Sequence, residues 1–87
     1  METAIDGAPA PTPEFSELLR GRLDDLARQS SLTGREREVF ELLVLGRSAH
    51  EMATVLGITA RTVKFHQQRV LEKIGADTRL DILRVLL

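Results

Sequence analysis

The sequence predicts an all-α protein: a four-helix helix-turn-helix domain with one additional helix before it. Three observations predict this class. Apolar residues recur at helical spacing, a helix-capping pattern precedes each apolar run, and no stretch alternates apolar and polar residues as a strand would. With 87 residues and 43% hydrophobic content, the chain is long enough for one small domain with a largely aliphatic core.

The first predicted helix follows a segment without helical pattern. Residues 1–11 are rich in Ala, Pro and Gly and predict a disordered leader. Residues 12–30 predict a helix and a short linker, because Thr12 can cap a helix and Pro13 suits its first position. Its apolar stripe consists of Phe15, Leu18, Leu19, Leu23 and Leu26. We expect this helix to lie outside the four-helix core, with its stripe buried on the outside of that core or on a second copy.

The four-helix domain is expected over residues 32–87. Thr33 and Glu36 have the spacing of a capping box, which predicts the start of a helix that Gly46 ends. The apolar residues of this helix cover a wide arc, so it should be buried on more than one side.

Residues 48–74 predict two helices joined by one tight turn. Ser48 and Glu51 have capping-box spacing, and Gly57 is suited to end the first helix in a left-handed conformation. Thr59 can then cap the second helix, which continues to the end of the segment. A pair of this geometry directs its second helix, N-terminal end first, into the major groove of DNA.

The second helix of the pair has a basic outer face, although the whole chain has a net charge of −1. Residues 59–74 contain four Lys or Arg and one acid, the local charge that phosphate binding requires. Base reading is predicted for Lys64, Phe65 and Gln68. Phe65 is equally well explained by packing on a partner or by simple exposure. Contacts with the DNA backbone are predicted for Thr59, Arg61, Thr62, Arg69, Lys73 and His50.

The last helix, predicted over residues 79–87, is apolar over about 220°, whereas one core-facing stripe needs only a little over 100°. Such a surface predicts a homodimer with a two-fold axis at this helix. The residues predicted nearest the axis are Ile82, Val85 and Leu86. Those predicted to face the core are Leu80, Leu83 and Leu87. The alternative is that the N-terminal helix covers this surface within one chain.

Composition excludes other functions. Without Cys there is no disulfide, thiol nucleophile or thiolate metal site, and no acid lies at metal-ligand spacing beside His50 or His66. We expect no cofactor, no metal and no enzymatic activity, because no nucleophile–base pair or phosphate-binding glycine loop is present. His66 should be a packed, hydrogen-bonded histidine. No apolar run is long enough for a membrane span, so we expect a soluble cytoplasmic protein.

Three motifs in this order resemble a known family. Leu-Thr-x-Arg-Glu at residues 32–36, Thr-Val-Lys-x-His at 62–66 and Lys-Ile-Gly at 73–75 are similar to the LuxR/GerE-type DNA-binding domain. The resemblance covers roughly residues 32–87. It implies a tetrahelical domain that binds double-stranded DNA as a dimer, regulates transcription in bacteria, reads bases from Lys64 onward and pairs through its last helix.

The sequence departs from that family at several positions. Ala49 and His50 stand where Asn and Lys are frequent, so we expect a weaker phosphate contact there. Gln68 replaces a common basic residue, which predicts a lower affinity or a different base preference. The usual N-terminal receiver or ligand-sensing domain does not fit in 31 residues. The chain is therefore either a piece of a larger regulator or a stand-alone regulator, and the leader with its own Met favours the second.

The function predicted from these observations is a sequence-specific DNA-binding transcriptional regulator that acts as a dimer. The competing hypothesis is a helical interaction module that pairs with another regulator and modulates it without binding DNA. The acidic N-terminal segment and the modest number of basic residues leave this second hypothesis open.

Overall fold

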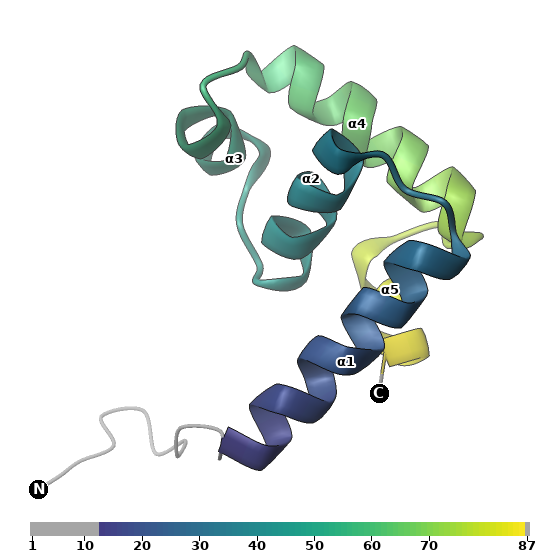
Figure 1. The fold of residues 1–87 in the computed structure, drawn as a ribbon. Helices are drawn as coiled ribbons and strands as arrows, with labels where there is room; N and C mark the ends of the chain where they lie inside the picture. The colour runs from purple at the N-terminus through teal and green to yellow at the C-terminus, as the bar shows by residue number, and fades with distance from the viewer. Residues whose placement is uncertain (1–12, 87) are drawn as a thin grey trace, which may run out of the picture.

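A computed structural model of the protein describes residues 13–86 and contains five α-helices and no strand in that range. The helices, in chain order, are α1 (Pro13–Gln29), α2 (Gly34–Val44), α3 (Ala49–Leu56), α4 (Ala60–Ile74) and α5 (Arg79–Leu86) (Figure 1). The predicted all-α class is therefore confirmed. The leader predicted over residues 1–11 lies outside the described residues, as do Thr12 and Leu87.

Side-chain caps start the helices where the sequence predicts them. Thr33 Oγ1 accepts a hydrogen bond from the Glu36 backbone N–H at 3.2 Å, and Glu36 Oε1 accepts one from the Thr33 backbone N–H at 3.0 Å. Ser48 and Glu51 repeat this capping box at α3, with distances of 3.1 and 2.9 Å. Such caps satisfy backbone N–H groups that have no partner within the first turn of a helix.

A glycine turn joins α3 to α4. Gly57 has φ +69° and ψ +33°, the left-handed conformation predicted from the sequence, and the Ile58 N–H donates to the Ala53 carbonyl at 3.1 Å. Only glycine takes this conformation without steric cost. The turn is therefore tight enough to set α4 across α3 after three linking residues.

We expect Gly57→Val to lower the free energy of unfolding by about 1–2 kcal/mol, because a β-branched residue is strained in the left-handed region. A Cβ at this position would meet no atom within 4 Å, so the cost lies in the backbone and not in a clash. Thermal unfolding followed by circular dichroism measures the change. Gly57→Asn is the matched control, since Asn tolerates this conformation better. Equal melting temperatures for the Val and Asn variants would contradict the prediction.

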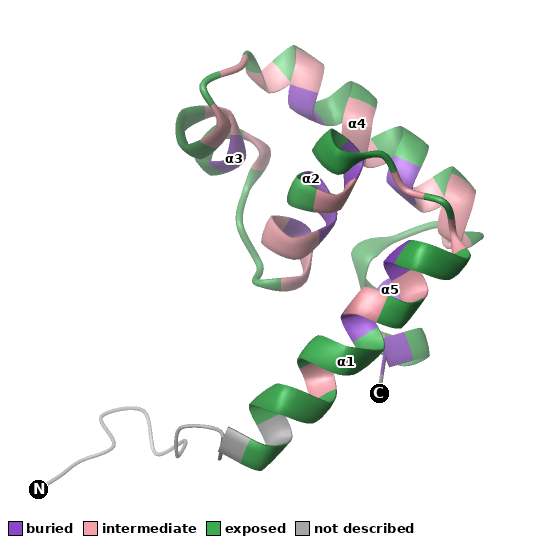
Figure 2. Ribbon diagram, viewed as in Figure 1, coloured by how far each residue is buried: buried purple, intermediate pink, exposed green. Residues whose placement is uncertain are grey.

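The core lies between α2, α3, α4 and α5 and receives residues from every helix. Phe40 of α2 and Met52 of α3 are completely buried in it, together with Val63 and Val70 of α4. Each helix has a buried stripe toward the interior and an exposed outer side (Figure 2). No helix of residues 13–86 is long and apolar enough to cross a membrane.

The second half of α1 belongs to this core, so the expectation that the helix lies outside it is wrong. Leu23 and Ala27 are buried in the same cluster as Phe40 and Met52. The Arg22 guanidinium donates to the Leu86 carbonyl of α5 at 3.3 Å. An ion pair between Asp24 and Arg37 adds a contact between α1 and α2. The N-terminal end of α1 extends away from the other helices (Figure 1), and Leu18 is 57% exposed.

The orientation predicted for α5 is also wrong. Ile82 and Leu86 are buried in the core, whereas Leu80 and Val85 are 57% and 58% exposed. Ile82 and Leu86 therefore cannot lie at a dimer axis, and Leu80 does not face the core. The apolar arc of α5 is wide enough to bury either side. The side that is buried is the Ile82–Leu86 stripe, and α5 packs against α1, α2 and α4. Helix α1 contacts α5 at Leu86, so it covers part of the arc within one chain, whereas Leu80 and Val85 remain exposed.

Candidate nucleic-acid interface

Helix α4 presents the polar face that the sequence predicts. Val63 and Val70 are completely buried, and this anchoring sets the rotation of the helix about its axis. Lys64, Phe65 and Gln68 consequently lie on the exposed side, so their predicted exposure is confirmed. Gln68 donates to the Glu72 carboxylate at 3.2 Å, a surface contact that can exchange for another partner.

The N-terminus of α4 is capped and open to solvent. Thr59 Oγ1 accepts a hydrogen bond from the Thr62 backbone N–H at 3.1 Å, and the two hydroxyl groups lie 2.9 Å apart. Arg61 is exposed beside them and has no ion pair among residues 13–86. The positive end of the helix dipole and this arginine together favour an anion at the start of α4.

The residues predicted to contact phosphates do not share one environment. His50, Thr59, Arg61 and Arg69 are exposed, and Thr62 is partly buried. Lys73 differs, because its ammonium group lies 2.7 Å from the Glu36 carboxylate and its side chain is only 26% exposed. It is held against the protein at the far end of α4.

Phe65 lies on the exposed side of α4, and its ring contacts the ring of His66. Phe65 is 60% exposed, and its ring meets the His66 ring edge-on, with the ring centroids 5.6 Å apart. His66 is partly buried, as expected, but its Nδ1 is buried without a hydrogen-bond partner among the described residues. The prediction of a hydrogen-bonded histidine is therefore not met at this nitrogen. Packing, including the contact with Phe65, accounts for the position of the ring.

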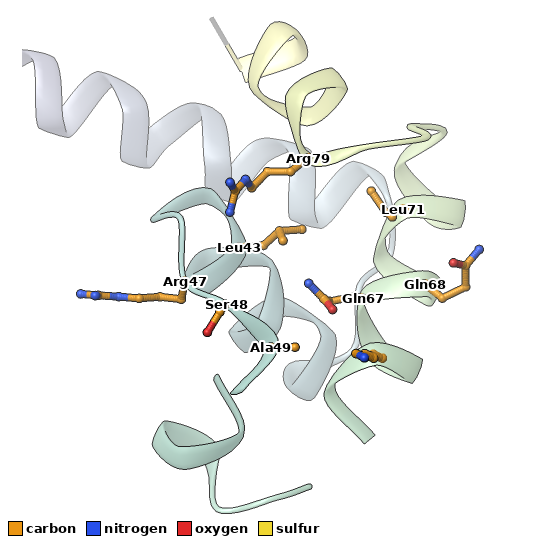
Figure 3. A pocket seen from close by; sticks show the side chains of 9 residues that line it. Leu43, Arg47, Ser48, Ala49, Gln67, Gln68, Leu71 and Arg79 are labelled. Atoms are coloured by element: carbon orange, nitrogen blue, oxygen red, sulfur yellow. The ribbon is translucent and has the colours of Figure 1, made fainter. Parts of the chain in front are cut away.

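A cleft of about 570 Å³ adjoins the outer face of α4 and reaches the ends of three other helices (Figure 3). Its lining residues are Leu43, Arg47, Ser48, Ala49, Lys64, Gln67, Gln68, Leu71 and Arg79. Gln67 is directed into the cleft, whereas Gln68 is directed away from it (Figure 3). The cleft thus brings Lys64 together with the N-termini of α3 and α5.

Two arginines of this cleft were not predicted as site residues. Arg47 precedes the cap of α3, and Arg79 is the first residue of α5. Both are exposed, and neither has an ion pair within the described part of the chain. They lie 32 positions apart, so only the packing of α5 beside α2 brings them to one cleft. The sequence signal that could have identified both as site residues is their position, since each is a basic residue next to a predicted helix N-terminus.

No group of three His, Cys, Asp or Glu side chains within residues 13–86 is arranged to hold a metal ion. The exposed groups around the cleft are cations, amides and hydroxyls, which suit hydrogen bonds to an anionic polymer.

Comparison with known proteins assigns the chain to a family. A family model described as bacterial regulatory proteins, luxR family, matches residues 30–86, which include α2 to α5. The chain belongs to the luxR family. Members of the luxR family are transcription regulators and not enzymes, and its DNA-binding domain has the helix-turn-helix fold seen here. Helix α1 precedes the matched segment.

Several curated proteins are similar to the chain. The transcriptional regulatory protein UhpA of Salmonella typhimurium is 40% identical over 82 residues, 94% of this chain and 39% of that protein. The transcriptional regulatory protein MctR of Rhizobium johnstonii is 36% identical over 73 residues, 84% of this chain and 33% of that protein. The spore germination protein GerE of Bacillus subtilis is 46% identical over 48 residues, 55% of this chain and 65% of that protein. No solved structure gave a significant match.

These relatives differ from the chain in length. The chain spans about a third of MctR, about two fifths of UhpA and just under two thirds of GerE. The family model matches the region of α2 to α5, and the alignments with UhpA and MctR are long enough to extend into α1.

Proposed function

We propose that this chain binds DNA in a sequence-specific manner, with α4 in the major groove, and thereby regulates transcription. The observation that carries the proposal is the exposed polar face of α4, which Val63 and Val70 hold at one rotation against the core. In this arrangement Lys64 donates to guanine O6 and N7, and Gln68 pairs with adenine N6 and N7. Phe65 contacts a thymine methyl group.

The backbone contacts come from both ends of the cleft. At the N-terminus of α4, the phosphates of one DNA strand are bound by Thr59, Arg61 and Thr62. Arg47 and Arg79 reach phosphates across the cleft from Lys64, because both are exposed and without an ion pair in the described residues. His50 and Arg69 lie at the margins of this surface.

A salt series tests the proposal. Fluorescence anisotropy with a labelled duplex should give a binding constant whose logarithm falls linearly with the logarithm of salt concentration, because bound cations displace counterions from the phosphates. Site selection from a random-sequence library should then enrich one motif. A chain that forms complexes with another regulator but shows no salt-dependent DNA binding would support the competing interaction module and refute this proposal.

We propose that the protein acts as a homodimer through the outer side of α5. The exposed arc of this helix runs from Leu80 across the Asp81–Arg84 ion pair to Val85. A two-fold axis at this arc buries both apolar side chains and places two α4 helices one helical turn of DNA apart. The selected site should then be roughly palindromic.

Val85→Glu should convert the dimer to a monomer, since the axis would bring two carboxylates together in an apolar contact. Sedimentation velocity over a range of protein concentrations measures the change. Leu45→Glu is the matched control, because Leu45 is 69% exposed but lies at the end of α2. A wild-type protein that stays monomeric at high concentration, with no palindrome in its selected sites, would contradict the dimer.

A further inference from the structure

Glu36 is the one buried charged residue in the described part of the chain, with 5% of its surface exposed. Three groups meet its carboxylate. Oε1 accepts hydrogen bonds from the Thr33 backbone N–H at 3.0 Å and from Lys73 Nζ at 2.7 Å, and Oε2 lies 3.8 Å from Arg69 Nε. The carboxylate therefore links the start of α2 to the last two turns of α4.

The charge on Glu36 is stabilised where it lies. A buried carboxylate is costly unless it is paired and hydrogen-bonded. Here the hydrogen bond from Lys73, and next that from the Thr33 backbone, outweigh the effect of burial and lower the pKa of Glu36. The group is thus ionised at neutral pH, and its electrostatic hold on the two cations of α4 is permanent under those conditions.

The two cations are held to different degrees. Lys73 Nζ donates both to the Glu36 carboxylate and to the Ser31 carbonyl, the latter at 3.3 Å, and its side chain is 26% exposed. Arg69 approaches only through Nε, and its side chain is 49% exposed. A guanidinium has four further N–H donors on its two terminal nitrogens. Lys73 is thus held in contacts within the protein, whereas Arg69 is oriented by Glu36 and keeps most of its N–H donors available.

We propose that Glu36 is a positioning residue of the DNA interface, which keeps Lys73 in the protein and orients Arg69 for one phosphate. This inference rests on the proposed function. It differs from the sequence-based expectation that Lys73 contacts the DNA backbone. The phosphates neutralised by α4 then lie along its first three turns, near the reading residues. Each phosphate contact contributes about 0.9 to the slope of log affinity against log salt, so Glu36 reduces that slope by about one.

Lysine labelling tests the proposal on the unaltered protein, because Lys64 and Lys73 are the only lysines of the chain. Acetylation by an activated ester, read by mass spectrometry of peptides, gives the reaction rate of each amine with and without a mixed-sequence duplex. Lys64 should react quickly and be protected by DNA. Lys73 should react slowly, at a rate that DNA leaves unchanged. Protection of Lys73 equal to that of Lys64 would overturn the proposal.

A pair of charge-removing variants gives the second test. Glu36→Gln keeps an acceptor for Thr33 and Lys73 but removes the charge that holds both cations. We expect it to steepen the salt slope by about one and to tighten binding to a mixed-sequence duplex severalfold at low salt. Glu38→Gln removes the same charge from an exposed position on α2, where Glu38 pairs with Arg35, and should leave the slope unchanged.

Lys73→Gln completes the comparison. It should leave the salt slope unchanged when Glu36 is present and lower it by about one in the Glu36→Gln background. Equal slopes for Glu36→Gln and Glu38→Gln would overturn the role of Glu36 while leaving the proposed function intact. A wild-type protein without salt-dependent binding would refute the proposed function itself. If Glu36→Gln does not fold, the lysine labelling of the unaltered chain decides alone.

Discussion

Lys64→Ala is expected to weaken binding to the selected DNA site by roughly 1–3 kcal/mol, which corresponds to a loss of about 5- to 150-fold in affinity. Lys64 is exposed on the outer face of α4 and lines the cleft with Arg47 and Arg79. Its loss removes a bidentate donor to guanine, so one base pair of the site should become degenerate in a repeated selection.

Two comparison variants make this result specific to base reading. Arg69→Ala should weaken binding to all sequences about equally, because a phosphate contact carries no sequence information. Arg28→Ala removes one positive charge from α1, outside the segment that the family model matches, and should change the affinity little. An unchanged affinity of Lys64→Ala at moderate salt would show that α4 does not read the major groove through this residue.

Leu23→Ala is expected to lower the free energy of unfolding by roughly 2–4 kcal/mol, because it opens a cavity in the core. Leu23 is 7% exposed and lies in the same buried cluster as Phe40 and Ile82. For a domain of this size such a loss lowers the melting temperature by about 8–30 °C. Urea denaturation monitored by circular dichroism measures the change.

The same helix supplies a matched control for this prediction. Leu18 is also a leucine of α1, but it is 57% exposed, so Leu18→Ala should change the stability by no more than about 0.5 kcal/mol. Similar small effects of both substitutions would show that α1 contributes nothing to the core, as the sequence alone led us to expect. A large effect of Leu23→Ala would mean that deletion of residues 1–30 destabilises the remaining domain.

The sequence by itself determined where the helices begin and end. The capping pairs Thr33–Glu36 and Ser48–Glu51 form the hydrogen bonds that their spacing predicts, and Gly57 has the predicted left-handed conformation. These features join residues within one turn of each other, so local sequence specifies them. The exposed face of α4 was predictable for the same reason, because the spacing of its apolar residues places Val63 and Val70 on one side.

Only the tertiary structure decided which surfaces meet. The apolar arc of α5 permits either Val85 or Ile82 to face inward, and the choice depends on how α5 packs against α1, α2 and α4, which are distant or separate elements of the sequence. The cleft that joins Arg47 to Arg79 and the ion pair of Lys73 with Glu36 depend on packing in the same way. Helical periodicity describes each helix about its own axis. The partner of a given face is set by the free energy of burying all the helices together, and no local pattern contains that information.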